Sequence, residues 1–273
     1  MRIANPTPPK WLLLTMSLLA SVGCDSPAIL QPPVGESSKM MHVFMVLDPA
    51  YTTQVLLVEP VGADQPLDGV VASMYRIDAG DSVLVADGTT TAGLAPCIDR
   101  YGRIDGWDFA CAVFPISVVP ETEYLVRIWA TDRPTATARV VVPGDFDIDS
   151  VEASGTPPGT GRLIAEWSES AYRKGYFVTV RPSSEPACIR TATCPSGWFI
   201  STDVNHVDTS ISPELLPDHS GSWLLEIHAL DPVLFDHLTT GSGGTLFPVS
   251  PRQNVEGGFG AVGAWVSRRR LLP

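Results

Sequence analysis

The clearest strand pattern in the sequence, and the one that determines the predicted fold class, is Glu123-Tyr-Leu-Val-Arg-Ile-Trp-Ala-Thr131. Successive side chains of an extended strand point to opposite faces, so alternate residues of this stretch share a face. One face carries Tyr124, Val126, Ile128 and Ala130, and the other carries Leu125, Arg127 and Trp129. Because the first set lacks any charge, we expect it to face a core. The stretch therefore predicts a β-strand that is buried on one side.

Similar short runs of β-branched and aromatic residues, separated by Gly, Pro and Asp, begin at Met41. They predict seven strands near residues 41–47, 54–59, 69–77, 82–86, 107–114, 123–131 and 136–142. Almost no stretch has the period of a helix. Seven short strands suit a sandwich of two sheets, so the predicted fold class is all-β.

The residues before the deciding strand, Val119-Pro-Glu-Thr-Glu-Tyr124, resemble the Pro-x-Thr-x-Tyr entry to a late strand of fibronectin type III domains. The resemblance implies that the Tyr124 hydroxyl ties a corner of the chain back to the backbone. Leu163–Trp167 followed by Gly175–Val180 again resembles fibronectin type III, with Trp167 filling the core. We therefore expect two tandem Ig-like or fibronectin III-like sandwiches.

Pro143-Gly144 interrupts the strand pattern, which predicts a domain boundary near residue 144. The first sandwich is then assigned to residues 41–144 and the second to residues 145–273. A short helix is expected near 232–239, because Asp231 can cap it, Pro232 suits its first position and Gly241 can end it. Residues 254–266 are predicted to form a glycine-rich final strand.

The start of the chain has the pattern of an export signal. Arg2 and Lys10 precede an apolar run over 11–20, and Ser21-Val-Gly-Cys24 follows. This resembles the bacterial lipobox, although Ser21 stands where Leu is commonest. We predict a lipoprotein signal peptide over 1–23, acylation at Cys24 and a disordered, Pro- and Ser-rich tether over 24–40.

Cysteine counting agrees with a lipid on Cys24. Five cysteines are odd in number, but removal of Cys24 leaves an even set for an oxidising compartment. Three pairings of the other four are possible. We favour Cys97 with Cys111 and Cys188 with Cys194, because each bridge closes a loop within one candidate domain. The sequence has no CxxC and no histidine cluster, so we expect no metal and no cofactor.

Composition limits the partners. The chain is 44% hydrophobic and 18% charged, as expected of an exported globular protein, and its net charge is -12. Neutralising phosphates requires a basic surface, so nucleic acid is excluded. The same acidity disfavours an electrostatic hold on anionic lipids, which leaves acyl chains as the anchor.

The tail contains Gly258-Phe-Gly-Ala-Val-Gly263, which has the GxGxxG spacing of dinucleotide-binding loops. That fingerprint needs a βαβ unit and an acidic residue about 20 positions later, and the sequence ends at Pro273. We interpret these glycines as permitting close packing or a bend. Phe259, Ala261 and Trp265 are then expected on one face of a strand.

Two pairs of residues have side chains suited to acid-base or metal chemistry. His206 with Asp208 and Glu226 with His228 are each two residues apart, so each pair shares a strand face, which we expect to be solvated. No nucleophile with a nearby base and no GxSxG turn is found, so we expect no enzymatic activity.

Three further features have a plain structural interpretation. Asp145, Asp147 and Asp149 offer oxygens to calcium but lack the rest of an EF-hand, which favours a polar hinge. The Arg268–Arg270 run is expected to be solvated. Trp198 and Phe199 are candidates for a sugar-binding surface, although core packing is the favoured interpretation.

Taken in order along the chain, these features resemble lipoproteins that carry the domain of unknown function 4249. The match comprises the lipobox cysteine, an Ig-like domain ending in Val140-Val-Val-Pro-Gly-Asp145, the helix at 232–238 and Asn254-Val-Glu-Gly-Gly-Phe-Gly-Ala-Val-Gly-Ala264. That family is often encoded beside TonB-dependent outer-membrane receptors and has no established catalytic residues.

The expected function is therefore that of a lipid-anchored, non-enzymatic binding or accessory module of the cell envelope, placed at the outer membrane, whose possible partner is such a receptor. One alternative is recognition of a glycan or surface polymer. The other is a hydrolase that uses the two histidine and acid pairs.

Overall fold

The computed structural model describes residues 40–61, 67, 69–91, 96–97, 110–154, 161–183, 198–211, 223–240 and 254–272. Strands account for most of them, so the predicted all-β fold class is confirmed. The predicted signal peptide, Cys24, nearly all of the predicted tether, and Cys188 and Cys194 lie outside the described residues. Within these ranges no helix is long and apolar enough to cross a membrane.

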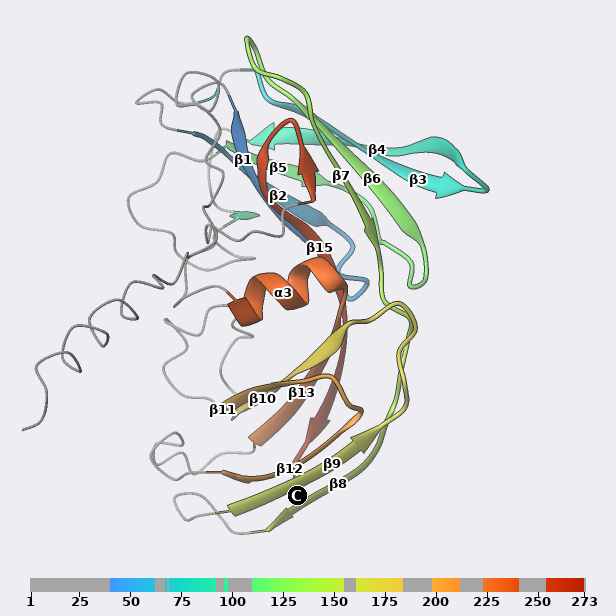
Figure 1. Cartoon of the computed structure of the whole chain (residues 1–273), viewed down its shortest axis with the longest axis vertical. Coiled ribbons are helices and arrows are strands. Elements are labelled where there is room, and N and C mark those ends of the chain that lie inside the picture. Colours follow the sequence, from blue (N-terminus) through green and yellow to red (C-terminus); the bar gives the residue numbers. More distant parts are fainter. Residues whose placement is uncertain are drawn as a thin grey trace, which may run out of the picture. The chain divides into compact units, whose positions relative to one another are not determined.

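Among the described residues, seven strands precede residue 144, and they confirm the seven predicted from the sequence (Figure 1). They are β1 (Met41–Leu47), β2 (Gln54–Pro60), β3 (Val71–Asp78), β4 (Asp81–Thr91), β5 (Ala110–Phe114), β6 (Glu123–Trp129) and β7 (Ala136–Val141). Two sheets share β4, whose first part pairs with β3 and whose end pairs with β5. The resulting order is β1-β2-β5-β4-β3-β6-β7.

The later strands also form two sheets. They are β8 (Ile148–Ser154), β9 (Gly161–Trp167), β10 (Gly175–Pro182), β11 (Trp198–Thr202), β12 (His206–Ile211) and β13 (Trp223–Leu230). One sheet has the order β12-β9-β8, and in the other β11, β10 and β13 are neighbours. Every pairing within these two sets is antiparallel.

The C-terminal strand β15 (Phe259–Leu271) connects the earlier strands to the later ones. Its residues 259–264 pair in parallel with β1, and its residues 265–271 pair antiparallel with β13. The short strand β14 (Val255–Glu256) pairs with β7. The predicted final strand is confirmed, but residues 255–264, which were assigned to the second domain, pair with strands of the first. The boundary near residue 144 falls between β7 and β8 and stays a prediction.

Strand β6 follows its predicted alternation except at Leu125, which shares a face with Arg127 but is only 9% exposed. Val126 and Ile128 are fully buried in the main core, whereas Arg127 and Trp129 face solvent. The Tyr124 hydroxyl accepts a hydrogen bond from the Val119 backbone N–H at 3.0 Å, so the predicted tyrosine corner is confirmed.

The later strands contain a second corner of the same kind. The Tyr176 hydroxyl accepts a hydrogen bond from the Ser170 backbone N–H at 3.0 Å. Trp167 is 1% exposed, and its ring centroid lies 5.1 Å from that of Tyr176. The predicted role of Trp167 in the core is therefore confirmed, and the fibronectin III-like device occurs twice in the chain.

A second apolar cluster lies between helix α3 (Pro232–Thr240) and the sheet that contains β1, β2 and β15. It includes Phe44 of β1, Leu234 of α3 and Trp265 of β15. The helix confirms the prediction for 232–239, and Asp231 caps it by accepting hydrogen bonds from the backbone N–H groups of Val233 and Leu234, each at 3.1 Å.

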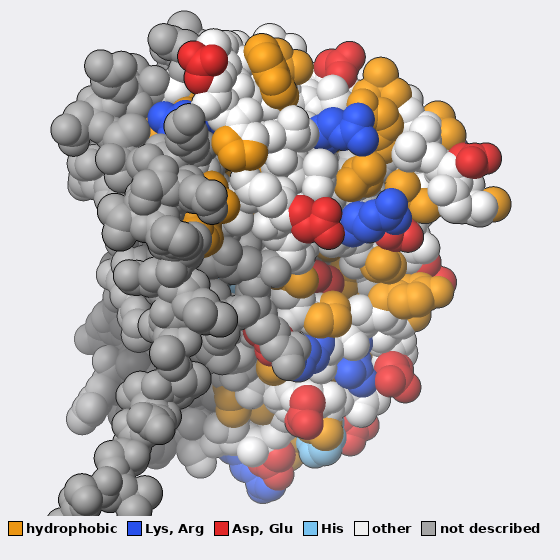
Figure 2. Space-filling model, turned by 45° about the horizontal axis from the view of Figure 1, so that its top comes forward, with side chains coloured by type: hydrophobic (Ala, Val, Ile, Leu, Met, Phe, Trp, Pro, Cys, Tyr) orange, Lys and Arg blue, Asp and Glu red, His pale blue; other side chains and the backbone are white. Residues whose placement is uncertain are grey.

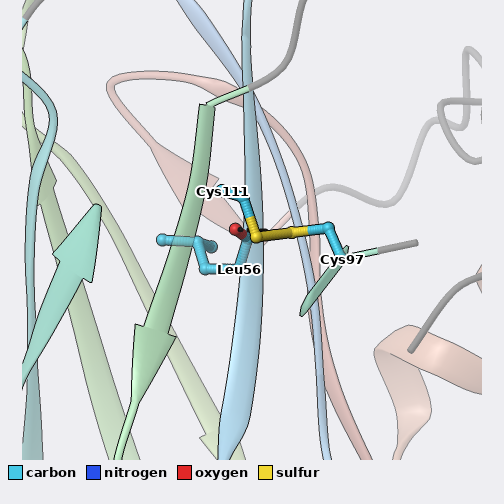
Figure 3. Close-up of a disulfide and its surroundings, with 3 residues drawn as sticks. All are labelled: Leu56, Cys97 and Cys111. Carbon is cyan, nitrogen blue, oxygen red and sulfur yellow. Dashed lines mark hydrogen bonds between the residues drawn. A yellow bond between two sulfur atoms is a disulfide. The ribbon is translucent and has the colours of Figure 1, made fainter. Parts of the chain in front are cut away.

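A disulfide joins Cys97 to Cys111 at the edge of this cluster, as predicted (Figure 3). Cys111 belongs to β5, and the Cys97 sulfur lies 3.8 Å from the carbonyl oxygen of Leu56 in β2. The disulfide therefore attaches residue 97 to the side of the sheet that faces the second apolar cluster. The opposite side of this sheet faces the main core.

The glycines of the GxGxxG stretch permit close approach, as expected. A Cβ at Gly260, whose φ is +107°, would lie 2.0 Å from the carbonyl oxygen of Val43 in β1. A Cβ at Gly263 would lie 2.7 Å from the Cβ of Leu234 in α3. β15 can therefore pair with β1 and lie under α3 only because these side chains are absent.

The Gly260→Ala variant is expected to lose at least about 3 kcal/mol of unfolding free energy, from backbone strain and the clash with β1. Gly80→Ala is the matched control, because Gly80 also has a positive φ of 96° but has open space around its Cβ position. Urea denaturation of both variants measures the steric part as their difference. Equal losses would mean that close approach of β15 to β1 does not require glycine.

Candidate functional site

The first predicted pair, His206 and Asp208, lies on β12 and is exposed to solvent, as expected. Arg162 of the neighbouring strand β9 donates two hydrogen bonds to the Asp208 carboxylate, at 2.7 and 2.5 Å. This contact lowers the pKa of Asp208 below its usual value. The carboxylate is thus held as an anion in a surface ion pair.

The second pair, Glu226 and His228 on β13, is buried, so the expectation of a solvated face is wrong. Glu226 is 1% exposed and His228 is 7% exposed. The Nε of Arg269 on β15 donates to Glu226 Oε1 at 2.6 Å, and the Arg181 guanidinium on β10 donates to Oε2 at 3.3 Å. These arginines compensate the cost of burying a carboxylate.

The polar contacts continue from Glu226 towards β1. The His228 Nδ1 lies 2.8 Å from the Ser267 hydroxyl, and the His228 ring packs against Trp265 with centroids 4.6 Å apart and planes tilted by 38°. The Trp265 indole N–H donates to Asp48 Oδ2 at 2.6 Å. The buried network of Glu226, His228, Trp265 and Asp48 thus runs from β13 through β15 to the residue after β1.

Charge and burial fix the protonation of this network. Burial alone would raise the pKa of Glu226, but the neighbouring His228, Arg269 and Arg181 together outweigh burial and lower the pKa below its usual value. Burial lowers the pKa of His228, which therefore stays neutral at neutral pH. Glu226 is accordingly an anion between two guanidinium groups.

The contact between Ser267 and His228 does not complete a hydrolytic site. A serine hydrolase needs an acid that hydrogen-bonds the second ring nitrogen of the base. His228 Nε2 lies 3.9 Å from Glu226 Oε1, beyond hydrogen-bond range. Glu226 already binds two arginines, and His206 and Asp208 belong to the other sheet. Within the described residues, the four predicted side chains therefore form no single acid-base site.

Replacing the buried acid should cost far more stability than replacing the exposed one. Glu226→Gln removes the charge that neutralises Arg181 and Arg269, and we expect a loss of about 3 kcal/mol in unfolding free energy. Asp208→Asn, in the exposed pair with Arg162, should cost far less, because solvent-exposed ion pairs contribute little to stability. Chemical denaturation measures both, and equal costs would show that the buried network does not support the fold.

Another carboxylate with a perturbed pKa lies on β2. Glu59 is opposite His42 of β1, and its Oε2 lies 3.5 Å from His42 Nδ1. Burial raises the pKa of Glu59 to about 7 and lowers the pKa of His42. Both side chains therefore favour their neutral forms in the folded protein.

The raised pKa of Glu59 makes folding pH-dependent. Its protonated form stabilises the fold fully below the unfolded value of 4.5, and this contribution is lost as pH rises to about 7. Glu59→Gln keeps the neutral shape at every pH. The melting temperature of this variant, relative to the unaltered protein, should therefore increase between pH 4.5 and pH 8.

Glu256→Gln provides the control for that experiment, because Glu256 is exposed on β14. The pH dependence of the Glu59→Gln difference is judged against that of this variant. His42 is present in all three proteins, so its opposite pH dependence largely cancels from the comparison. A Glu59→Gln difference that is flat with pH would contradict the shift.

The acidic residues near 145–149 and the arginine run at 268–270 also form contacts within the protein. Asp145 forms an ion pair with Arg268, and the backbone N–H of Asp147 donates to the Ser168 hydroxyl at 2.8 Å. Arg268 and Arg269 bind carboxylates and Arg270 donates to the Ile148 carbonyl, so the arginine run is not simply solvated. Among the described residues, no group of three or more His, Cys, Asp or Glu side chains could hold a metal ion.

One face of the earlier sheets remains open. On β3 and β6, Val71 is opposite Trp129, and these side chains are 51% and 49% exposed. Leu84 of β4 is opposite Tyr75 and is 51% exposed. We call the outward positions of β4, β3, β6 and β7 the outer face. Its central members are Val71, Ser73, Tyr75, Leu84, Asp87, Glu123, Leu125, Arg127, Trp129, Thr137 and Arg139.

The space-filling view shows hydrophobic side chains interleaved with charged ones over the described surface (Figure 2). Trp198 and Phe199 of β11 are the residues that the sequence suggests for a sugar-binding surface, and their side chains lie outside the described residues. Trp129 was not among the predicted site residues, although the alternation of β6 places it opposite the core. Arg181 and Ser267 were not predicted either, because their partners come from other strands.

The class that the fold defines is an all-β protein with fibronectin III-like and Ig-like sandwich sheets. No family model and no curated protein matches the chain, so the resemblance to domain of unknown function 4249 stays a prediction. One similar solved structure is the crystal structure of the chicken CNTN1 FN1-FN3 domains, with 15% identity and a TM-score of 0.23 over 84% of this chain. The chain spans 64% of that structure's length.

Proposed function

We propose that this chain is a lipid-anchored, non-enzymatic binding module of the bacterial cell envelope and an accessory of a TonB-dependent outer-membrane receptor. The observation that supports binding is the outer face, where Trp129, Val71 and Leu84 are each about half exposed among polar side chains. Exposed large apolar side chains rimmed by polar residues are typical of ligand-binding surfaces. The carboxylates of Asp208 and Glu226, the acids considered for hydrolysis, are both engaged in ion pairs with arginines. This favours binding over hydrolysis.

The anchor is supported by the sequence. A basic start, a short apolar run and Gly23-Cys24 have the order that lipoprotein export requires. The net charge of -12 gives no electrostatic hold on an anionic membrane, so acyl chains on Cys24 would supply the attachment. The Cys97–Cys111 disulfide agrees with an oxidising compartment.

The TonB-dependent partner comes from the resemblance to lipoproteins of domain of unknown function 4249, many of which are encoded beside such receptors. Sandwiches that are each stabilised by a tyrosine corner are suited to present a fixed surface to a neighbouring membrane protein. Glycan recognition is the second candidate, and the exposed indole of Trp129 favours it specifically.

The anchor and the partner can be tested in one preparation. The protein purified from membranes should carry acyl chains on an N-terminal Cys24 by mass spectrometry, and a TonB-dependent receptor should co-purify after crosslinking. Cys24→Ala should leave the membrane fraction, because the covalent lipid is the expected attachment.

Cys97→Ala with Cys111→Ala is the matched control, since it removes cysteines but leaves Cys24. This control should remain in the membrane fraction. An unmodified Cys24 thiol would overturn the lipid anchor, and crosslinked material without a receptor would overturn the partner.

A further inference from the structure

Trp129 is held in place by its strand. It is the last residue of β6 and is paired with Val71, and the preceding Ile128 is fully buried in the main core. The buried Ile128 and the pairing with β3 therefore hold the backbone in place, while the indole ring of Trp129 is about half exposed. An aromatic ring displayed in this way loses little conformational entropy when a ligand stacks on it.

A row of polar groups crosses the sheet beside Trp129. Thr137, Arg127, Ser73 and Asp87 occupy adjacent positions on β7, β6, β3 and β4. The Ser73 hydroxyl donates to Asp87 at 2.8 Å. The Arg127 guanidinium lies over the Tyr75 ring, 5.4 Å from its centroid. Hydrogen-bond donors and acceptors are thus positioned at strand spacing, about 4.8 Å apart.

The outer face has balanced charge, in contrast to the whole chain. Its central positions carry two arginines, Arg127 and Arg139, and two acids, Asp87 and Glu123. Arg139 and Glu123 pair with each other at 3.1 Å. The whole sequence has a net charge of -12. Such a face has no excess of one charge with which to select a polyanion or a polycation, which favours an uncharged ligand.

The apolar groups are too interrupted for a stable protein interface. Such interfaces bury more than about 1,000 Å² around a core depleted of charged residues. Here Arg127 and Asp87 lie between the apolar pair of Val71 with Trp129 and the pair of Tyr75 with Leu84. A sugar ring instead offers a small apolar C–H face with hydroxyl groups around its rim, which suits one aromatic ring beside a polar row.

From these observations we infer that the outer face binds a neutral glycan, with a sugar ring stacked on Trp129 and its hydroxyls bonded by Arg127, Ser73 and Asp87. This inference rests on the proposed binding function. It names the ligand class and the residues that recognise it.

Affinity electrophoresis of the purified protein tests the inference. The gels contain soluble β-1,3-glucan, dextran or galactomannan as neutral glycans, or alginate as a polyanion. At least one neutral glycan should retard the protein, and alginate should not. Trp129→Ala should weaken the association constant at least tenfold, because the stacking ring is lost.

Tyr172→Ala is the matched control, because Tyr172 is 59% exposed on the turn before β10 and lies outside the outer face. It should bind as the unaltered protein does. Thermal melting reports whether Trp129→Ala folds, and Arg127→Ala, with an expected loss of at least threefold, replaces it if it does not.

Three results would overturn the inference: no retardation by any of the neutral glycans, retardation that Trp129→Ala retains, or a preference for alginate. Loss of a crosslinked receptor in Trp129→Ala, with no glycan bound, would assign the face to a protein instead. Acylation of Cys24 and membrane attachment are measured separately, so a failed glycan test leaves the proposed anchor unaffected.

Discussion

The dual pairing of β15 is the constraint on which the other described elements depend. One strand pairs in parallel with β1 over its first half and antiparallel with β13 over its second. Parallel pairing requires a long connection, and here nearly the whole chain separates the two partners. The close approach is sterically possible because Gly260 and Gly263 have no side chains. Asp231, which caps α3 with two hydrogen bonds, also binds β15 here: its carboxylate accepts a hydrogen bond from the backbone N–H of Ala264 at 2.9 Å.

The buried polar network follows from this strand. Because β15 lies between β13 and β1, Trp265 and Arg269 reach Asp48 on one side and Glu226 on the other. Ionic groups in an apolar interior are costly unless each has a partner, and truncating one partner exposes the full cost. The network therefore favours one register of β15 against its neighbours, since a shift by one residue would move every side chain to the opposite face. Its contacts thus stabilise the pairing of these three strands.

Periodicity and local motifs carried most of the fold information. The alternation in Glu123–Thr131, the entry to Tyr124 and the helix signals at Asp231 and Pro232 all depend on neighbours within a few residues, and all are confirmed. The burial of Glu226 and His228 was not predicted, because their compensating arginines come from β10 and β15. One signal was available: Glu226 interrupts the apolar run of Trp223–Leu230, and a lone acid there calls for a buried partner. The bond from Trp265 to Asp48 joins residues 217 positions apart, and no local pattern encodes it.

The two outward faces of strands β1–β7 differ in burial. One is covered and supports the fold, and the other is exposed and is the proposed binding surface. The face carrying Phe44 and Leu57 packs beneath α3 and Cys97 in the second apolar cluster, whereas Trp129 and Val71 of the outer face are about half exposed. Trp265 illustrates the first case, because its ring is buried and its N–H is bonded to Asp48. Trp129 illustrates the second, since half of its apolar surface is in water, where it contributes little to folding. The free energy gained by covering that surface is what the proposed glycan would draw on, and the buried side of β6 fixes the backbone from which the ring projects.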